Sequence, residues 1–172
     1  MKIPIQLEPA ATDGPPARVE YRWDPDTEIL SAQVTPRTSG QGLSGSLELA
    51  GADGCWLILD VSAGRINGAE VAVWPEVHKR DALEPPGQVE DAGVLVPSRR
   101  SKPGLAAVEV ETAMLAEADD AERVFHFTLG RPKQTRTVRL ARDLMLDVDS
   151  ANNLVGLWLL NVPPFPASMP QP

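Results

Sequence analysis

The chain has 172 residues and a mass of 18.5 kDa, which fits one domain or two very small ones. Its 16 Lys and Arg residues against 24 Asp and Glu residues give a net charge of −8. This charge argues against a nucleic-acid partner, because such proteins gather basic residues on one face. The 17 prolines and 13 glycines leave little room for helices of typical length and favour short strands joined by tight turns.

The N-terminal segment 1–9 has one lysine, two prolines and no sustained apolar run, so it does not resemble a secretory signal. No window approaches the run of about 18 apolar residues that a membrane-spanning helix needs. Cys55 is the only cysteine, which excludes an internal disulfide. These features predict a cytoplasmic protein that does not bind membranes.

The first half of the chain is predicted to form strands. Val19, Tyr21 and Trp23 alternate with charged residues, which is the period of a half-buried strand. The following residues 24–26 (DPD) are turn formers. Alternating or short apolar runs predict further strands at 29–34, 46–50, 55–61 and 66–74.

Two stretches of the chain, 57–75 and 144–163, follow one pattern. Each has an apolar run ending in Leu-Asp-Val, a polar turn, a glycine, a second apolar run and a proline. A weaker match relates 24–34 to 119–129. The pattern predicts a tandem duplication, with coincidence between two ordinary hairpins as the alternative. The predicted parts are repeat 1 at 17–77, a polar linker at 78–104, repeat 2 at 105–165 and a Pro-rich tail at 166–172.

The second half also reads as strands, at 124–129, 137–140, 144–148 and 154–162. Residues 106–123 are ambiguous, because their Ala, Glu, Met and Leu residues favour a helix. The match between the repeats favours strands, at least at 114–118. A short helix within 106–123 is the alternative.

A unit of about 60 residues buries only about 60% of its unfolded surface and is marginally stable alone. The predicted fold class is therefore all-β, with two antiparallel units of about five strands packed around a pseudo-twofold axis. The expected result is one sandwich or partly closed barrel, and the linker runs over its outside.

Short motifs in both halves resemble those of a known family. Segment 21–30 has a Tyr-Asp-Pro-like turn before a strand, and segment 146–160 has a Leu-Asp-x-Asp turn before a glycine-containing strand, as does 59–71 in part. These motifs resemble a family of small uncharacterised bacterial β-rich domains with a Val-Gly-Ile-Glu-Ile-Leu strand. The first unit departs from it by a long glycine loop, and the second lacks the Tyr and Pro. The resemblance implies a β-rich fold and no known activity.

The glycine loop at 40–45 matches G-x-G-x-x-G of dinucleotide-binding proteins. The following residues 46–51 alternate like a strand and leave no place for the helix whose N-terminus holds the phosphates. The motif is therefore interpreted as a flexible loop.

Acidic and amide residues crowd the turn of the second hairpin and raise the alternative of a calcium site. They are Asp147, Asp149, Asn152 and Asn153. An EF-hand loop that begins at Asp147 needs glycine at its sixth position and glutamate at its twelfth, where this chain has Asn152 and Trp158. Turn residues are the preferred interpretation.

The sequence contains no recognisable catalytic, cofactor or metal motif. His78 and His126 lie in different parts of the repeat and lack the spacing of metal ligands. Cys55 begins an apolar strand and is interpreted as a buried, inert thiol. The tail contains a PxxP spacing without flanking basic residues, so we expect it to pack on the domain or to extend from it.

Trp56, Trp74 and Trp158 form the candidate interaction surface, because tryptophan is enriched where partners dock or sugars stack. Burial of these side chains in the core is the alternative. The strand around Trp158 is apolar on both faces and must be covered twice, by the other unit or by a second chain. This requirement predicts a homodimer.

The sequence thus predicts a non-catalytic β-rich module that binds a protein partner or itself. Binding of a small ligand or carbohydrate on a Trp-bearing sheet face or in a barrel mouth is the alternative. An enzyme with an unrecognised Asp, Glu and His site is the third hypothesis.

Overall fold

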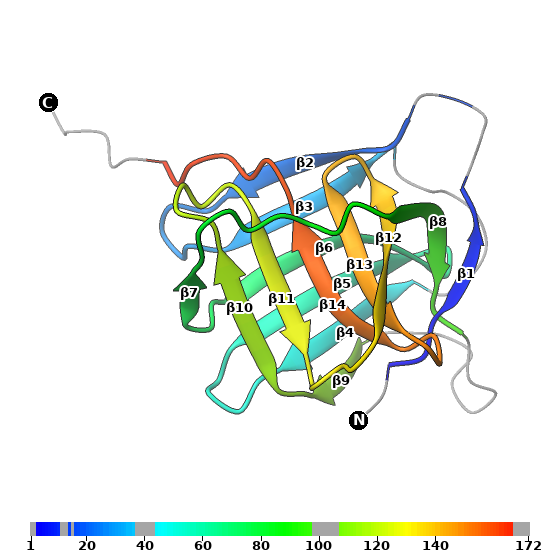
Figure 1. The fold of residues 1–172 in the computed structure, drawn as a ribbon. Helices are drawn as coiled ribbons and strands as arrows, with labels where there is room; N and C mark the ends of the chain where they lie inside the picture. The colour runs from blue at the N-terminus through cyan, green and yellow to red at the C-terminus, as the bar shows by residue number, and fades with distance from the viewer. Residues whose placement is uncertain (1–2, 11–13, 15, 37–43, 98–106, 167–172) are drawn as a thin grey trace, which may run out of the picture.

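The structure is a computed structural model and describes residues 3–10, 14, 16–36, 44–97 and 107–166. These residues form fourteen strands and no helix, so no described helix could cross a membrane (Figure 1). The strands are β1 (Gln6–Pro9), β2 (Arg18–Trp23), β3 (Leu30–Thr35), β4 (Gly45–Ala50), β5 (Trp56–Ser62), β6 (Arg65–Val73), β7 (Val77–Lys79), β8 (Val89–Leu95), β9 (Ala107–Glu111), β10 (Met114–Ala118), β11 (Phe125–Leu129), β12 (Thr135–Ala141), β13 (Leu144–Asp149) and β14 (Leu154–Leu159).

The two halves of the chain pair their strands in the same order. The first sheet, as we call it, runs β2-β3-β6-β5-β4, and the second sheet runs β10-β11-β14-β13-β12. In both central hairpins an aspartate lies opposite a glycine and a register shift follows it: Asp60 opposite Gly68, and Asp147 opposite Gly156. The two halves thus share one strand order, and their origin by duplication stays a prediction.

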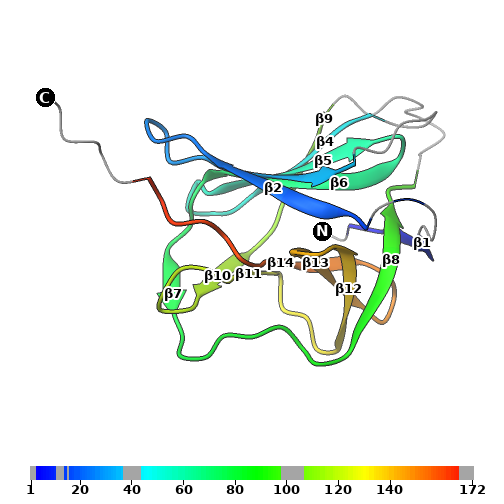
Figure 2. The ribbon, with the colours of Figure 1, turned by 90° about the horizontal axis from the view of Figure 1, so that it is seen from above.

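Three strands that lie between β6 and β10 in the chain extend the two sheets. β9 pairs with β4 in the first sheet, whereas β7 and β8 pair with β10 and β12 in the second. All three pairings are parallel, so the sheet is mixed where the sequence predicted antiparallel pairing. β8 also pairs with β1 and meets β6 at Arg65, so it links the two layers at one side of the molecule (Figure 2).

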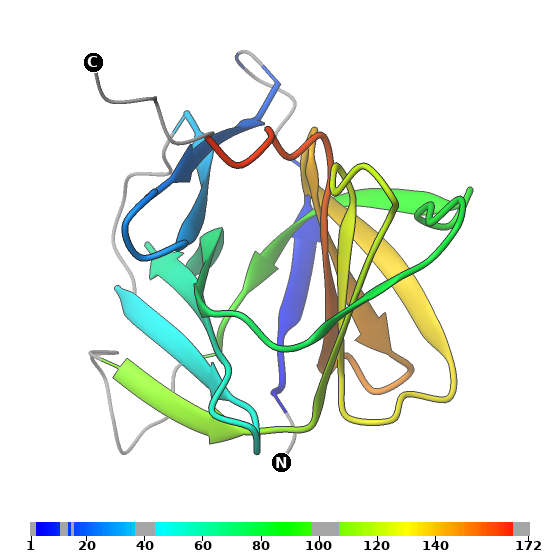
Figure 3. The same ribbon diagram turned by 90° about the vertical axis from the view of Figure 1, so that its left-hand side faces the viewer.

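The core lies between the two layers, which are seen side by side in Figure 3. In β5, Leu57, Leu59 and Val61 point inward and are buried, while the residues between them are half-buried. In the second sheet, Leu144 and Leu146 point inward from β13 and are fully buried. The all-β sandwich or partly closed barrel expected from the sequence is confirmed.

The segment 106–123, which the sequence left open, forms strands β9 and β10. The strand prediction for 114–118 is confirmed and the helix alternative is wrong. Pairing with neighbouring strands overrides the helix propensity of this segment. β10 lies between β7 and β11 and buries Ala116 and Ala118 in the core.

Part of the expected linker is regular structure. Residues 78–104 were expected as a polar connection, but they contribute β8, whose Ala92 and Val94 are buried. β1, which pairs with β8, was not predicted. The alternating pattern of β8 is broken by three exposed or glycine residues, which hides the strand from pattern analysis.

Candidate functional site

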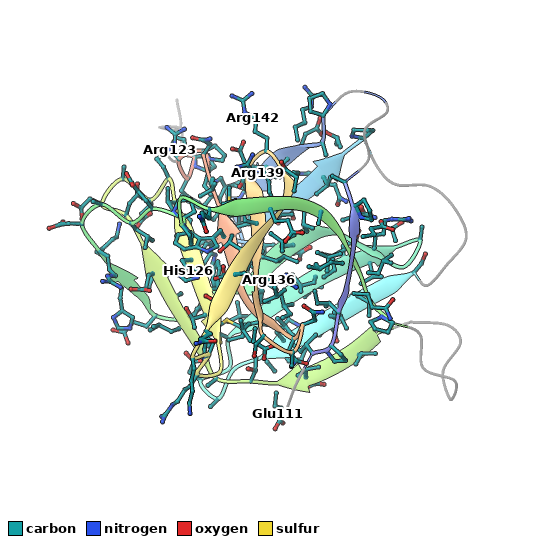
Figure 4. All side chains as sticks on the ribbon, turned by 45° about the vertical axis from the view of Figure 1, so that its right-hand side comes forward. Glu111, Arg123, His126, Arg136, Arg139 and Arg142 are labelled. Carbon is teal, nitrogen blue, oxygen red and sulfur yellow. The ribbon has the colours of Figure 1, made fainter. Side chains whose placement is uncertain are left out.

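The most connected polar group of the described residues lies on the outer face of the second sheet. The Asp147 carboxylate accepts a hydrogen bond from Thr137 Oγ1 at 2.7 Å and from Trp158 Nε1 at 3.2 Å to each oxygen. His126 Nε2 lies 2.8 Å from Asp147 Oδ2. Asp147 and Thr137 are buried, and the His126 side chain is 17% exposed. Figure 4 labels His126 on β11.

The glycine opposite Asp147 explains this geometry. A Cβ at Gly156 would lie 2.5 Å from Asp147 Oδ2, so only glycine lets the carboxylate lie across β14 and reach His126. The His126 ring stacks on Trp158 with 3.8 Å between ring centroids and 11° between ring planes. Residues from four strands therefore meet at one carboxylate.

Alternating charges continue this group toward the sheet edge. Glu117 Oε1 lies 3.9 Å from His126 Nδ1, and Arg80 forms an ion pair of 2.8 Å with the other oxygen of Glu117. His78 of β7 sits opposite Glu117 in the strand register, so both histidines flank the same glutamate. Within the described ranges, no group of three or more His, Cys, Asp and Glu side chains is arranged to hold a metal ion.

The chemistry of this group is that of a satisfied buried network. Three donors surround the Asp147 oxygens, and the two nitrogens of His126 face carboxylates rather than a hydroxyl or thiol. A buried carboxylate is tolerated when donors compensate its lost hydration. The network therefore fastens β11, β12, β13 and β14 together.

A shallow hollow of about 540 Å³ adjoins the network. It is lined by residues 86–90 and 135–137, with Thr137 shared between the hollow and the network. Arg136, labelled in Figure 4, lines it and lies 3.8 Å from Glu90. The hollow is thus bordered by an ion pair rather than by unpaired charge.

The crowded turn of the second hairpin divides into two roles. Asp149 accepts hydrogen bonds from the backbone N–H groups of Ala151 and Asn153, which agrees with the interpretation as turn residues. Asp147 instead belongs to the network. Residues 40–43 of the glycine motif lie outside the described residues, and Gly45 begins β4.

Cys55 is 1% exposed. Burial and the nearby Asp53 raise the pKa of the thiol to about 11, and its sulfur lies 3.9 Å from the sulfur of Met114. A thiol of this kind is a poor nucleophile at neutral pH.

The three tryptophans of the candidate surface lie in three different places. Trp158 is buried beneath His126. Trp74 stacks on Trp23 with 5.7 Å between centroids, contacts Phe125 and donates to the Glu28 carbonyl. Trp56 is half-buried on the outer face of the first sheet.

A segment of the chain itself crosses the outer face of the second sheet. Residues 80–88, which we call the strap, cross the outer face of the second sheet between β7 and β8 (Figures 1 and 2). In this sheet the outward side chains of Met145 and Trp158 are each 4% exposed, and the His126 ring stacks on Trp158. The strand around Trp158, β14, is therefore buried on both faces within a single chain, and it no longer argues for a second chain.

The corresponding face of the first sheet is open. Ile58 occupies the place in β5 that Met145 occupies in β13, yet Ile58 is half-buried and Val73, opposite Trp56, is 51% exposed. No described residue crosses this face as the strap crosses the other. We call the outward side chains of Ala50, Trp56, Ile58 and Val73 the Trp56 face.

These features define an all-β protein of two layers whose halves share one strand order. Outward apolar side chains are buried on the outer face of the second sheet and half-buried or exposed on that of the first. No family model matches the chain, and no curated protein matches it.

Proposed function

We propose that this protein is a non-catalytic interaction module that binds a protein partner through the Trp56 face. The observation that carries the proposal is the difference between the two outer faces. Outward apolar side chains of the central hairpin are buried in the second sheet, whose outer face the strap crosses, and are half-buried or exposed in the first. An apolar patch with a central tryptophan is typical of docking surfaces.

The polar network does not favour catalysis over binding. Both oxygens of Asp147 accept hydrogen bonds. The His126 ring stacks on Trp158, and each of its nitrogens faces a carboxylate. A general base needs a proton to abstract within hydrogen-bond reach, and the network directs His126 at acceptors instead.

Library panning tests the proposal. The protein is panned against displayed peptides and domain fragments, and the enriched binders are measured against Trp56→Ser and Val73→Asp. We expect both variants to weaken binding at least about tenfold, because central apolar anchors dominate interface energies.

Leu115→Asp is the matched control, because it removes a 45% exposed leucine from the second sheet. Thermal unfolding confirms that each variant is folded. Binders that ignore Trp56 and Val73, or panning that enriches none, contradict the proposal.

Carbohydrate is the second candidate, favoured by the Glu48 and Glu70 side chains that flank Ile58 one row away from Trp56. Carboxylates beside an indole ring suit sugar hydroxyls above a stacked pyranose. Titration of the Trp23→Phe, Trp74→Phe variant with a sugar panel tests it, because Trp56 then dominates the exposed-indole fluorescence. An unchanged spectrum excludes this candidate.

A further inference from the structure

The strap shows which kind of segment a face of this fold accepts. It enters through β7, which adds to the edge of β10, and the backbone N–H of Arg80 then donates to the Ala118 carbonyl at 2.8 Å. Along the strap, Leu83 and Pro85 are half-buried while their neighbours are exposed. After a turn at Asp81 and Ala82, where the φ of Ala82 is +53°, the strap continues without helix or strand, and alternate side chains along it are half-buried.

Basic side chains at the start of the strap and at the end of the adjoining β7 pair with carboxylates. Arg80 pairs with Glu117 at 2.8 Å, and Lys79 pairs with Glu122 at 2.7 Å. The Glu117 side chain is only 12% exposed, so the first of these pairs is partly shielded from solvent.

The open face of the first sheet carries carboxylates around its apolar centre. The strand registers place Glu48 and Glu70 on either side of Ile58, Glu109 beyond Glu48, and Glu111 beside Ala50. In the described part of the chain, none of these four carboxylates forms an ion pair. Figure 4 labels Glu111 at the sheet edge.

Charge selects among the occupants of this face. A second copy of the chain brings a net charge of −8 and is repelled at long range. A basic segment is attracted and can neutralise the four carboxylates while its apolar side chains cover Trp56 and Ile58.

We infer that the Trp56 face binds an extended, basic segment of another protein, in which apolar residues alternate with lysine or arginine. The segment lies across the first sheet as the strap lies across the second. This inference rests on the proposed function and specifies its partner.

The inference is tested with a labelled peptide in which lysines alternate with leucines around a central proline. Binding to the intact protein is followed by fluorescence anisotropy at low and high salt. We expect Glu48→Gln/Glu70→Gln to weaken binding about tenfold, and added salt to weaken it further. The control variant Glu76→Gln/Glu84→Gln removes the same charge from exposed positions in and before the strap and leaves binding unchanged.

A companion peptide with glutamine in place of each lysine separates the two proposals. If both peptides bind equally and Trp56→Ser abolishes both, the basic partner is wrong and the interaction face stands. If the lysine peptide binds Trp56→Ser as well as the intact chain, its attachment is unspecific and the inference is wrong. A dimer in light scattering that Trp56→Ser dissolves identifies a second copy as the occupant and also overturns the inference.

Discussion

At Gly156 the missing side chain controls the placement of a buried charge. Any Cβ would lie 2.5 Å from Asp147 Oδ2 and 3.0 Å from Asp147 Cβ, so the carboxylate would have to leave the position between His126 and Trp158. Neighbouring donors would then lose their acceptor in a buried environment, where an unmet hydrogen bond costs about 1–3 kcal/mol.

We expect Gly156→Ala to lower the free energy of unfolding by about 2–4 kcal/mol, from both the close contact and the disturbed network. Urea denaturation measures it. Gly87→Ala is the matched control, because nothing lies within 4 Å of its added Cβ. Equal stability of the two variants would show that Asp147 is not held as described.

The buried thiol and phenol give the stability a dependence on pH. Burial raises the pKa of Cys55 from 9.0 to about 11, and burial also raises that of Tyr21, whose hydroxyl donates to the Leu160 carbonyl at 2.7 Å. In both, the folded state disfavours the charged form. The unfolded chain therefore loses its protons first, and the free energy of unfolding falls as pH rises.

We expect stability to fall between pH 9 and pH 11, as the unfolded thiol ionises while the folded one stays protonated. Denaturation curves across this range measure the slope. Cys55→Ala removes one titrating group and flattens the slope in part, with Tyr21 retained. A slope that Cys55→Ala leaves unchanged would rule out the thiol as its source.

At the scale of the elements, the strap crosses the outer face of the second sheet, and we expect it to limit the solvent exposure of that face. The β13 strand beneath it is buried on both faces, whereas β5 alternates between buried and half-buried residues. Leu83 and Pro85 are the half-buried residues of the strap. We expect them to cover Met145, which lies on the outer face of this sheet and is 4% exposed.

Glycine at both positions, Leu83→Gly/Pro85→Gly, is expected to loosen the strap and expose Met145 to oxidation. Oxidation of Met145 is measured by hydroxyl-radical footprinting with mass spectrometry. We expect it to be several-fold higher in this variant than in the intact chain. Glu84→Gly/Pro86→Gly changes the exposed neighbours and leaves Met145 protected. Equal oxidation in both variants would show that Met145 is covered by something other than these side chains.

Periodicity located most strands because it reports burial directly. The hairpins around Leu-Asp-Val were predicted from alternating or continuous apolar runs, and the structure places them as β5–β6 and β13–β14. The strap escaped prediction because it pairs with no strand along most of its length, and β8 because two exposed acidic residues and a glycine break its alternation. The need to cover the strand around Trp158 on both faces was predicted, although Trp158 itself, which is 4% exposed, was assigned to the candidate interaction surface.

The polar network could not be read from the sequence for a related reason. His126 and Asp147 are 21 residues apart, and their contact depends on strand order and on the glycine at 156. One signal was available: each Leu-Asp-Val run is followed by a glycine that the register places opposite its aspartate. That signal predicts a contact only when the register of the hairpin is known.

On the scale of the whole molecule, the halves share one core and several connections. Trp74 packs on Phe125, and Tyr21 donates to the carbonyls of Asp143 and Leu160. The inner faces of the two sheets contribute to the same cluster of buried residues. Neither half therefore has a complete core.

We expect a fragment of residues 1–80 to unfold without a cooperative transition, because it lacks the second layer and a unit of this size is marginal alone. Calorimetry and circular dichroism of the fragment, with the full chain as control, measure this. A sharp transition in the fragment would establish two independent domains instead.

The stretch between β6 and β10 pairs with one border strand of each five-stranded set: β9 pairs with β4, and β8 pairs with β12. Unpaired strand edges invite aggregation. Expressing either half without this stretch would uncover the amide and carbonyl groups of β4 or β12. A partner therefore meets two layers whose strand edges depend on one unbroken chain.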